Sequence, residues 1–105
     1  MAEWTLVVVC DEAGPERRFE VGEKPLLIGR ASEADIRLEG DMVSRRHARV
    51  YLEDGALLIE DLDSRNGLTV NDVSTLRATL AQGNRITVGA FTFSVEQRGV
   101  LPPDS

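Results

Sequence analysis

The sequence predicts an all-β protein, because short segments rich in β-branched and aromatic residues alternate with turn residues along most of the chain. No window of the 105 residues keeps a helical period of apolar residues for three turns. Many strands at close spacing are typical of a β-sandwich or a barrel. The segments that we interpret as strands are 4–10, 17–21, 26–30, 35–38, 47–52, 57–61, 68–71, 85–89 and 91–96.

Period-two alternation is clearest in segments 47–52 and 91–96. Successive side chains of a strand point to opposite faces, so each segment is expected to pack one face and to expose the other to water. The packed set is Ala48, Val50, Leu52, Phe91, Phe93 and Val95, and the solvated set is His47, Arg49, Tyr51, Thr92, Ser94 and Glu96.

Turn signals divide these strands. The Asp-Gly pair in 53–56 is the pair that a tight hairpin with positive φ angles prefers, and 82–84 and 88–90 mark further reversals. A chain of this length is about one domain, which we place at residues 1–98. The stretch 99–105 contains two prolines after the last strand pattern, so we interpret it as a flexible tail or the start of a linker.

Composition excludes several classes of protein. The formal charge of −6 argues against a surface that attracts nucleic acid everywhere. No apolar stretch approaches the roughly 20 residues of a membrane span, and the first residues lack a basic region followed by an apolar signal core, so we expect an unsecreted protein. The single cysteine, Cys10, cannot form an intramolecular disulfide and follows an apolar run, so we expect a buried thiol in a soluble, cytoplasmic protein.

No constellation for catalysis or metal binding is apparent. One histidine and one cysteine do not make a usual zinc site, and no phosphate-cradling GxxxxGK motif is present. The carboxylates Glu60, Asp61 and Asp63 are neighbours, but we interpret them as a solvated rim or a loop former. We therefore expect no enzyme activity, no metal and no cofactor.

Three loops, 29–34, 39–47 and 63–68, place polar residues next to strand ends. Eleven of the twelve basic residues are arginine, the side chain that binds oxyanions through two parallel N–H bonds, and six of these lie between residues 30 and 65. Taken one at a time, the loops have an ordinary interpretation as turns with solvated charge. Together they favour a local anion site within an acidic protein.

The order and spacing of these loops resemble the forkhead-associated (FHA) family of phosphothreonine-binding domains. The match extends over nearly the whole chain and has several ordered motifs. They are LLIGR (26–30), ADIRL (34–38), VSRRH (43–47), EDLDSRNG (60–67), VN (70–71) and QGNRITVG (82–89).

The resemblance implies an FHA-like β-sandwich (SMAD/FHA type) of about eleven strands, whose loops at one end bind phosphothreonine in an extended peptide. It implies that Arg30 supplies a guanidinium to the phosphate, that Ser44 donates its hydroxyl and that Arg45 donates its backbone N–H. These donors suit a phosphate monoester, which carries nearly two negative charges and three strong acceptor oxygens.

The same resemblance assigns the third loop to the peptide. Asn66 matches the family asparagine that bonds to the peptide backbone just after the phosphothreonine, and Arg65 lies beside it as another contact. Structural support is expected from Gly29, His47 and Gly67. The histidine is expected to brace the loops through hydrogen bonds without touching ligand.

Two positions depart from the family pattern. Leu68 stands where a threonine usually follows Asn-Gly, which puts that threonine's hydrogen bond inside the loop in question, and Asn84 stands where an aspartate is usual. Met42 lies in the loop that helps to choose the residue three positions after the phosphothreonine in this family. Its apolar side chain hints at an apolar preference there.

The sequence thus predicts a phosphothreonine-dependent protein interaction module of Ser/Thr kinase signalling. Its expected partner is a phosphothreonine-containing protein or peptide, with no nucleic acid and no membrane. One alternative is an FHA-like scaffold that binds a protein partner or itself independently of phosphate. Nucleic-acid binding through RRHAR (45–49) is a further alternative. It is disfavoured because no aromatic residues that could stack on nucleobases lie between these basic residues.

Overall fold

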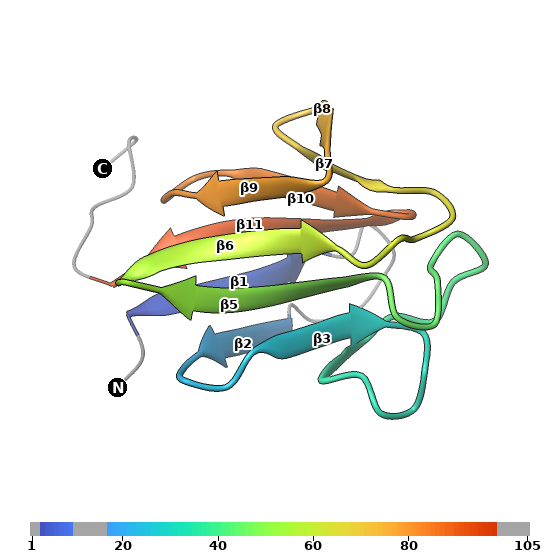
Figure 1. The fold of residues 1–105 in the computed structure, drawn as a ribbon, viewed down its shortest axis with the longest axis horizontal. Helices are drawn as coiled ribbons and strands as arrows, with labels where there is room; N and C mark the ends of the chain where they lie inside the picture. The colour runs from blue at the N-terminus through green and yellow to red at the C-terminus, as the bar shows by residue number, and fades with distance from the viewer. Residues whose placement is uncertain (1–2, 10–16, 99–105) are drawn as a thin grey trace.

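We describe residues 3–9 and 17–98 of the chain in a computed structural model. These residues form eleven strands in two sheets and contain no helix, so the predicted all-β sandwich is confirmed (Figure 1). The expectations for Cys10 and for the tail 99–105 lie outside the described residues. The strands are β1 (Trp4–Val9), β2 (Arg17–Val21), β3 (Leu26–Gly29), β4 (Ile36–Arg37), β5 (Ala48–Glu53), β6 (Ala56–Asp61), β7 (Leu68–Val70), β8 (Val73–Thr75), β9 (Arg77–Leu80), β10 (Arg85–Val88) and β11 (Phe91–Gln97).

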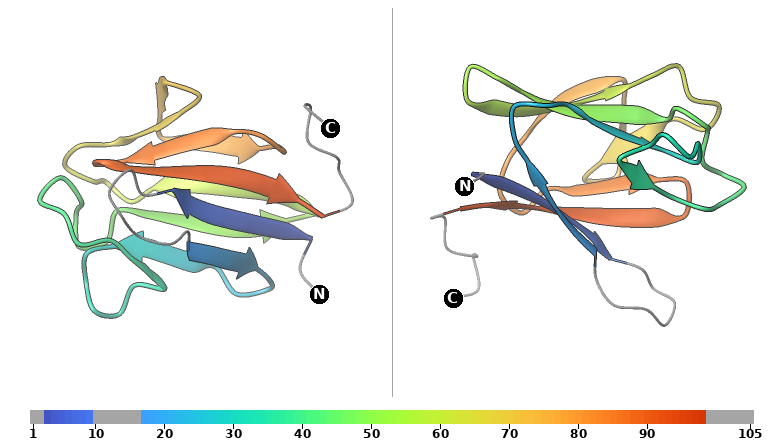
Figure 2. Two further views of the ribbon diagram at one scale, coloured as in Figure 1. Left: turned by 180° about the vertical axis from the view of Figure 1, so that it is seen from behind. Right: turned by 90° about the horizontal axis from the view of Figure 1, so that it is seen from below.

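The two sheets are stacked as layers (Figure 2). One sheet has six strands in the order β2-β1-β11-β10-β7-β8, and the other has five in the order β4-β3-β5-β6-β9. The pairings are antiparallel except that of the short strand β4 with β3. The chain crosses between the sheets after β2, β6, β8 and β9, so residues from both layers meet at the ends of the sandwich.

Apolar side chains from both sheets fill the space between the layers. On β11, Phe93 and Val95 are buried and Phe91 packs against the same cluster, which confirms the predicted alternation there. On β5, Ala48 and Val50 have no exposed surface. Phe93 is the largest side chain of this core that is fully buried, with 0% exposure.

The alternation predicted for 47–52 is wrong at its first residue. His47 was expected on the solvated face, but its side chain is 0% exposed. The strand begins only at Ala48, and the backbone of His47 instead bonds to two other segments: its N–H donates to the Ile28 carbonyl at 2.9 Å, and its carbonyl accepts from Leu62 N–H at 2.9 Å. The direction of the His47 ring is therefore set by its loop contacts and not by the side-chain alternation of β5.

The predicted reversals are confirmed. Asp54 and Gly55, between β5 and β6, have φ angles of 53° and 82°, the positive values that a two-residue hairpin of this twist requires. Gly83 and Gly89, with φ angles of 88° and 59°, lie in the turns before and after β10. The Asn-Gly pair ending at Gly67 does not form a hairpin, because β6 and β7 belong to different sheets.

Strands β8 and β9 were not anticipated from the sequence. A hairpin joins β7 to β8 through Asn71 and Asp72, whose φ angles of 51° and 69° are positive although neither residue is glycine. Asn71 is held there by two hydrogen bonds to the backbone of Arg85, from its N–H at 2.7 Å and to its Oδ1 at 2.8 Å.

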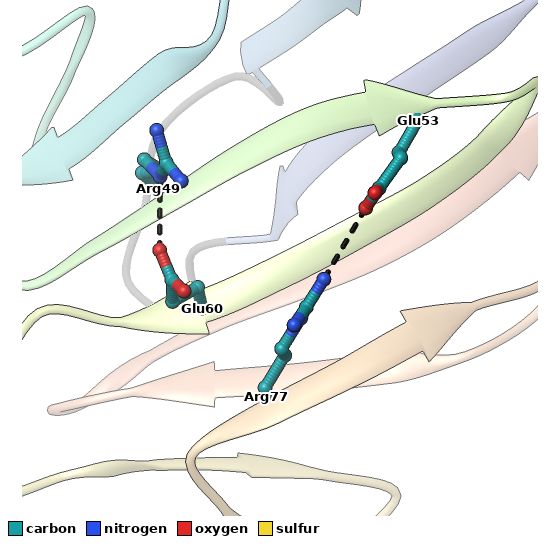
Figure 3. A network of polar contacts seen from close by, with 4 residues as sticks. All are labelled: Arg49, Glu53, Glu60 and Arg77. Atoms are coloured by element: carbon teal, nitrogen blue, oxygen red, sulfur yellow. Dashed lines mark hydrogen bonds and ion pairs between the residues drawn. The ribbon is translucent and has the colours of Figure 1, made fainter.

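The outer face of the five-stranded sheet carries cross-strand ion pairs (Figure 3). Arg49 of β5 pairs with Glu60 of β6 at 3.0 Å, and its guanidinium lies 4.5 Å from the centre of the Tyr51 ring. Arg77 of β9 reaches across β6 to Glu53 at 3.2 Å. These side chains are partly exposed, so each pair contributes at most about 1 kcal/mol to stability. Their main effect is to neutralise the arginines of this face.

Replacing Phe93 by alanine should lower the free energy of unfolding by about 3–5 kcal/mol, because the change removes a fully buried ring from between the sheets. Urea denaturation followed by tryptophan fluorescence measures this loss. Ser94→Ala is the matched control on the opposite face of β11 and should change stability by less than about 1 kcal/mol. Equal losses from both variants would contradict the assignment of Phe93 to the core.

Candidate functional site

Three loops gather at one end of the sandwich, after β3, before β5 and between β6 and β7 (Figure 1). They enclose a pocket of ≈ 250 Å³. The five side chains that the sequence assigned to phosphate or peptide all line this pocket, together with two residues of the turn before Ser44. The lining residues are Arg30, Asp41, Val43, Ser44, Arg45, Arg65 and Asn66. The sequence pattern does not indicate a role for Asp41, which the fold nevertheless places in the pocket lining.

A close backbone approach brings the first two loops together at Gly29. A Cβ on this residue would lie 2.1 Å from the Arg45 carbonyl oxygen, so only glycine fits without a shift of backbone. The neighbouring amides complete the contact: Arg30 N–H donates to the Ser44 carbonyl at 3.0 Å, and Ala31 N–H donates to the Arg45 carbonyl at 3.1 Å. The end of β3 and residues 44–45 are therefore one rigid unit.

The Arg30 side chain is fixed at one nitrogen and open at the others. Its Nε donates to the Val43 carbonyl at 3.1 Å, which orients the guanidinium plane beside Ser44. Its two terminal amino groups make no hydrogen bond or ion pair within the described residues. A guanidinium held in this way presents two parallel donors, the arrangement that suits a phosphate or carboxylate.

The Ser44 hydroxyl is oriented by the third loop. Its oxygen accepts a hydrogen bond from Arg65 N–H at 2.9 Å. A hydroxyl has one hydrogen to donate in addition to its acceptor lone pairs, and in the described part of the chain that hydrogen has no acceptor. Ser44 can therefore donate to an anion in the pocket while Arg65 holds its oxygen in place.

The His47 ring joins two loops from behind the pocket. Nδ1 accepts a hydrogen bond from Ser44 N–H at 3.0 Å, so the ring hydrogen is on Nε2, which donates to the Gly67 carbonyl at 2.7 Å. The ring is fully buried and does not line the pocket. This is a bracing position, with one acceptor and one donor, both used.

The third loop also has bonds of its own. The Asp61 carboxylate accepts from the backbone N–H of Ser64 at 3.0 Å and from its hydroxyl, and the Ser64 hydroxyl oxygen accepts from Gly67 N–H at 2.8 Å. Gly67 has a φ angle of 72°, which a residue without Cβ adopts at no cost. Asp61 is thus a loop former, whereas its neighbour Glu60 is held by Arg49.

Leu68, the departure from the family pattern, is buried at the start of β7 and belongs to the apolar core. Asn84 keeps the turn before β10, because its Oδ1 accepts a hydrogen bond from Ala81 N–H at 2.7 Å.

Asn66 connects the third loop to the turn that precedes Ser44. Its Nδ2 donates to the Met42 carbonyl at 3.0 Å, and its Oδ1 has no partner within the described ranges. The side chain is exposed and can accept a hydrogen bond from a ligand N–H while it remains anchored to Met42. Met42 itself is 52% exposed at the rim.

Charge distinguishes the pocket from the rest of the surface. Arg30, Arg45 and Arg65 form no ion pair among the residues that the structure describes. Six other arginines do pair with carboxylates, including two that follow Arg45 closely in the sequence: Arg46 lies 4.0 Å from Glu33, and Arg49 pairs with Glu60. The six are Arg18, Arg37, Arg46, Arg49, Arg77 and Arg85. The basic cluster of the sequence therefore divides into neutralised side chains and a set left open to an anion.

Two features are absent from residues 3–9 and 17–98. No group of three or more His, Cys, Asp or Glu residues there has the arrangement to hold a metal ion. No helix there is long and apolar enough to cross a membrane.

Comparison with known proteins identifies the class that this fold and pocket define. The family model "FHA domain" matches residues 26–89. A solved structure from a study of phosphothreonine-dependent FHA domain interactions superposes with a TM-score of 0.82 and 33% sequence identity, covering 92% of this chain and 98% of that one. The chain belongs to the FHA domain family.

Two curated relatives come from mycobacteria. The chain is 36% identical over 86 residues to the glycogen accumulation regulator GarA of Mycolicibacterium smegmatis, and 35% identical over 85 residues to the FHA domain-containing protein FhaA of Mycobacterium tuberculosis. These alignments cover 82% and 81% of this chain, but only 54% of GarA and 16% of FhaA. Each relative therefore has further sequence that this chain does not match.

Gly29→Ala should destabilise the protein by about 1–3 kcal/mol, because the added methyl group meets the Arg45 carbonyl. Gly22→Ala is the matched control, since a Cβ there has nothing within 4 Å, and it should change stability by less than about 1 kcal/mol. Urea denaturation gives the free energies, and amide chemical shifts should move at residues 44–45 in the first variant only. Unchanged shifts at these residues would refute the close approach.

His47→Ala should cost about 2–5 kcal/mol of stability, because it leaves the Ser44 N–H and the Gly67 carbonyl without their buried partner and opens a cavity. Hydrogen exchange by NMR should show faster exchange at Ser44 N–H. The control Arg46→Ala, at the exposed neighbouring residue, should stay within about 1 kcal/mol of wild type. Wild-type protection of Ser44 in His47→Ala would show that the imidazole does not hold this amide.

Proposed function

We propose that this chain is a phosphothreonine-dependent binding module that recognises proteins phosphorylated by a Ser/Thr kinase. The observation that carries the proposal is the convergence of Arg30, Ser44 and Arg45 on one pocket, with anion-binding donors that have no acceptor among residues 3–9 and 17–98. Family membership supports it, as does the structural similarity to a domain studied for phosphothreonine-dependent interactions.

The phosphate would bind at the first two loops. Arg30 would donate from its two terminal amino groups, Ser44 from its hydroxyl and Arg45 from its backbone N–H, with the Arg45 guanidinium adding charge. A phosphate monoester offers three acceptor oxygens and up to two negative charges, so it can satisfy these donors together. Hydrogen bonds to charged groups contribute about 1.5–3 kcal/mol each, which makes the phosphate the main source of affinity.

The peptide backbone would bind at the third loop. Asn66 would accept from a peptide N–H through Oδ1, and Arg65 would lie along the chain next to the phosphothreonine. Gly29, His47 and Gly67 would take no part in direct contact and would hold the three loops in register. The proposed role is binding rather than catalysis, in the cytoplasm, and it requires no cofactor.

The expected affinity is micromolar, about −8 kcal/mol, because ordering a flexible peptide offsets part of the gain from the phosphate. Aspartate or glutamate in place of phosphothreonine should bind poorly, since a carboxylate has one charge and two oxygens. The interaction would be specific and readily reversible.

Arg30→Ala should weaken binding of a phosphothreonine peptide by about 10- to 100-fold, because it removes one charge-assisted pair of hydrogen bonds. Arg30→Lys, which keeps the charge but loses the planar fork, should also bind more weakly than wild type. Isothermal titration calorimetry against a phosphothreonine peptide library measures both. Arg46→Ala, which changes an arginine outside the pocket lining, is the control and should bind within about twofold of wild type.

The same peptides without phosphate should show no measurable binding. Equal binding of phosphorylated and unphosphorylated peptides, or equal binding by wild type and Arg30→Ala, would refute the proposal. A protein complex that survives the double change Arg30→Ala and Ser44→Ala would instead favour a phosphate-independent scaffold.

A further inference from the structure

A single carboxylate lies in the wall of the proposed phosphate site. Asp41 lines the pocket together with the three arginines, and its side chain makes no hydrogen bond or ion pair within residues 3–9 and 17–98. The nearby acid Glu39 differs in both respects, because it pairs with Arg37 at 3.5 Å and does not line the pocket. An unpaired acid beside an anion site weakens anion binding unless the ligand brings a cation to it.

The turn that carries Asp41 is fixed rather than loose. Val43 N–H donates to the Gly40 carbonyl at 3.1 Å and closes the turn. The carbonyls of Met42 and Val43 accept from Asn66 Nδ2 and Arg30 Nε, at 3.0 and 3.1 Å.

Residues at the end of β10 and the start of β11, in the six-stranded sheet, pack against this turn. A Cβ on Gly89 would lie 2.9 Å from Val43 Cγ2 and 3.2 Å from the Met42 carbonyl carbon, so the turn is in close contact with the end of β10. A Cβ on Gly40 would likewise lie 3.1 Å from the Phe91 ring. The Asp41 backbone is therefore held in place beside the phosphate donors.

The net positive charge of the residues that line the pocket is about equal to the negative charge of one phosphate. Three guanidinium groups and one carboxylate leave two net positive charges, and a phosphate monoester carries between about 1.5 and 2 negative charges at neutral pH. A further acidic residue on the peptide would meet Asp41 with no cation left to offset it. A basic residue there would gain an unpaired partner. The chain's net charge of −6 acts in the same direction during approach.

We propose that Asp41 selects peptides that carry a lysine or arginine beside the phosphothreonine. This inference rests on the proposed function and adds to it the class of peptide that the pocket accepts. Met42, the next residue of the same turn, suggests an apolar preference three positions after the phosphothreonine. That preference is separate from the charge preference proposed for Asp41.

The test uses phosphothreonine peptides of equal length in which one lysine, glutamate or alanine is placed in turn at each position flanking the phosphothreonine. Fluorescence anisotropy gives the dissociation constants for wild type, Asp41→Asn and the matched control Glu39→Gln, which removes one charge from the same loop outside the pocket. At about 0.05 M salt, wild type should bind the best-placed lysine peptide about two- to fivefold more tightly than the alanine peptide, and the glutamate peptide more weakly.

The preference should disappear in Asp41→Asn, persist in Glu39→Gln and shrink in wild type at about 0.5 M salt. Phosphopeptides that bind with no charge preference, or a preference unchanged in Asp41→Asn, would overturn the inference alone. An equal loss of affinity for every peptide in Asp41→Asn would also overturn it, because Asp41 would then act only on the arginines. Absence of binding by any phosphopeptide would instead refute the proposed function.

Discussion

The buried imidazole of His47 is the contact on which the arrangement of the pocket depends. It accepts from Ser44 N–H and donates to the Gly67 carbonyl, so it connects the loop before β5 with the loop that crosses to the other sheet. The two bonds require one acceptor and one donor about an imidazole's width apart. A lysine or arginine has no acceptor, and a protonated ring would direct an N–H at another N–H. The neutral Nε2–H tautomer is therefore the form that this structure uses.

The remaining loop contacts build on this bridge. Because His47 fixes the amide of Ser44, the Ser44 hydroxyl is in position to accept from Arg65 N–H, and the carbonyls of residues 44–45 can pack against Gly29. Hydrogen bonds of Asp61 and Ser64 hold the third loop in its conformation. Leu68 can therefore pack in the apolar core although it makes no side-chain hydrogen bond to that loop. The usual threonine at this position is thus not needed for the order of the loop in this chain.

An acidic protein can hold an anion because its charges act over different ranges. At physiological ionic strength the screening length is about 8 Å, so the net charge of −6 has little influence on a phosphate that already lies against Arg30, Arg45 and Arg65. Arg49 and Arg77, by contrast, are neutralised by carboxylates on their own sheet and do not compete for it. The net charge affects approach and the choice of partner, whereas the local lining determines whether a phosphate stays.

The sequence predicted those parts of the structure that follow from local pattern. Alternation identified β11, and the Asp-Gly turn identified the hairpin at residues 54–55. It missed the short strands β8 and β9, where the apolar residue Val73 is 66% exposed and obscures the two-residue period of β8. It also misplaced His47, because alternation cannot show that a strand begins one residue later and that the ring is needed elsewhere.

In the candidate site, too, some residues could be predicted from the sequence and others could not. The resemblance of the ordered motifs to the FHA family brought Arg30, Ser44 and Asn66 forward, and all three line the pocket. Asp41 belongs to none of these motifs. Its position depends on a turn that packs against Gly89, a residue 48 positions further along the chain. A tertiary contact of this kind leaves no period and no spacing in the sequence. The residue that distinguishes this pocket from a general phosphate site is therefore one that only the folded chain could place there.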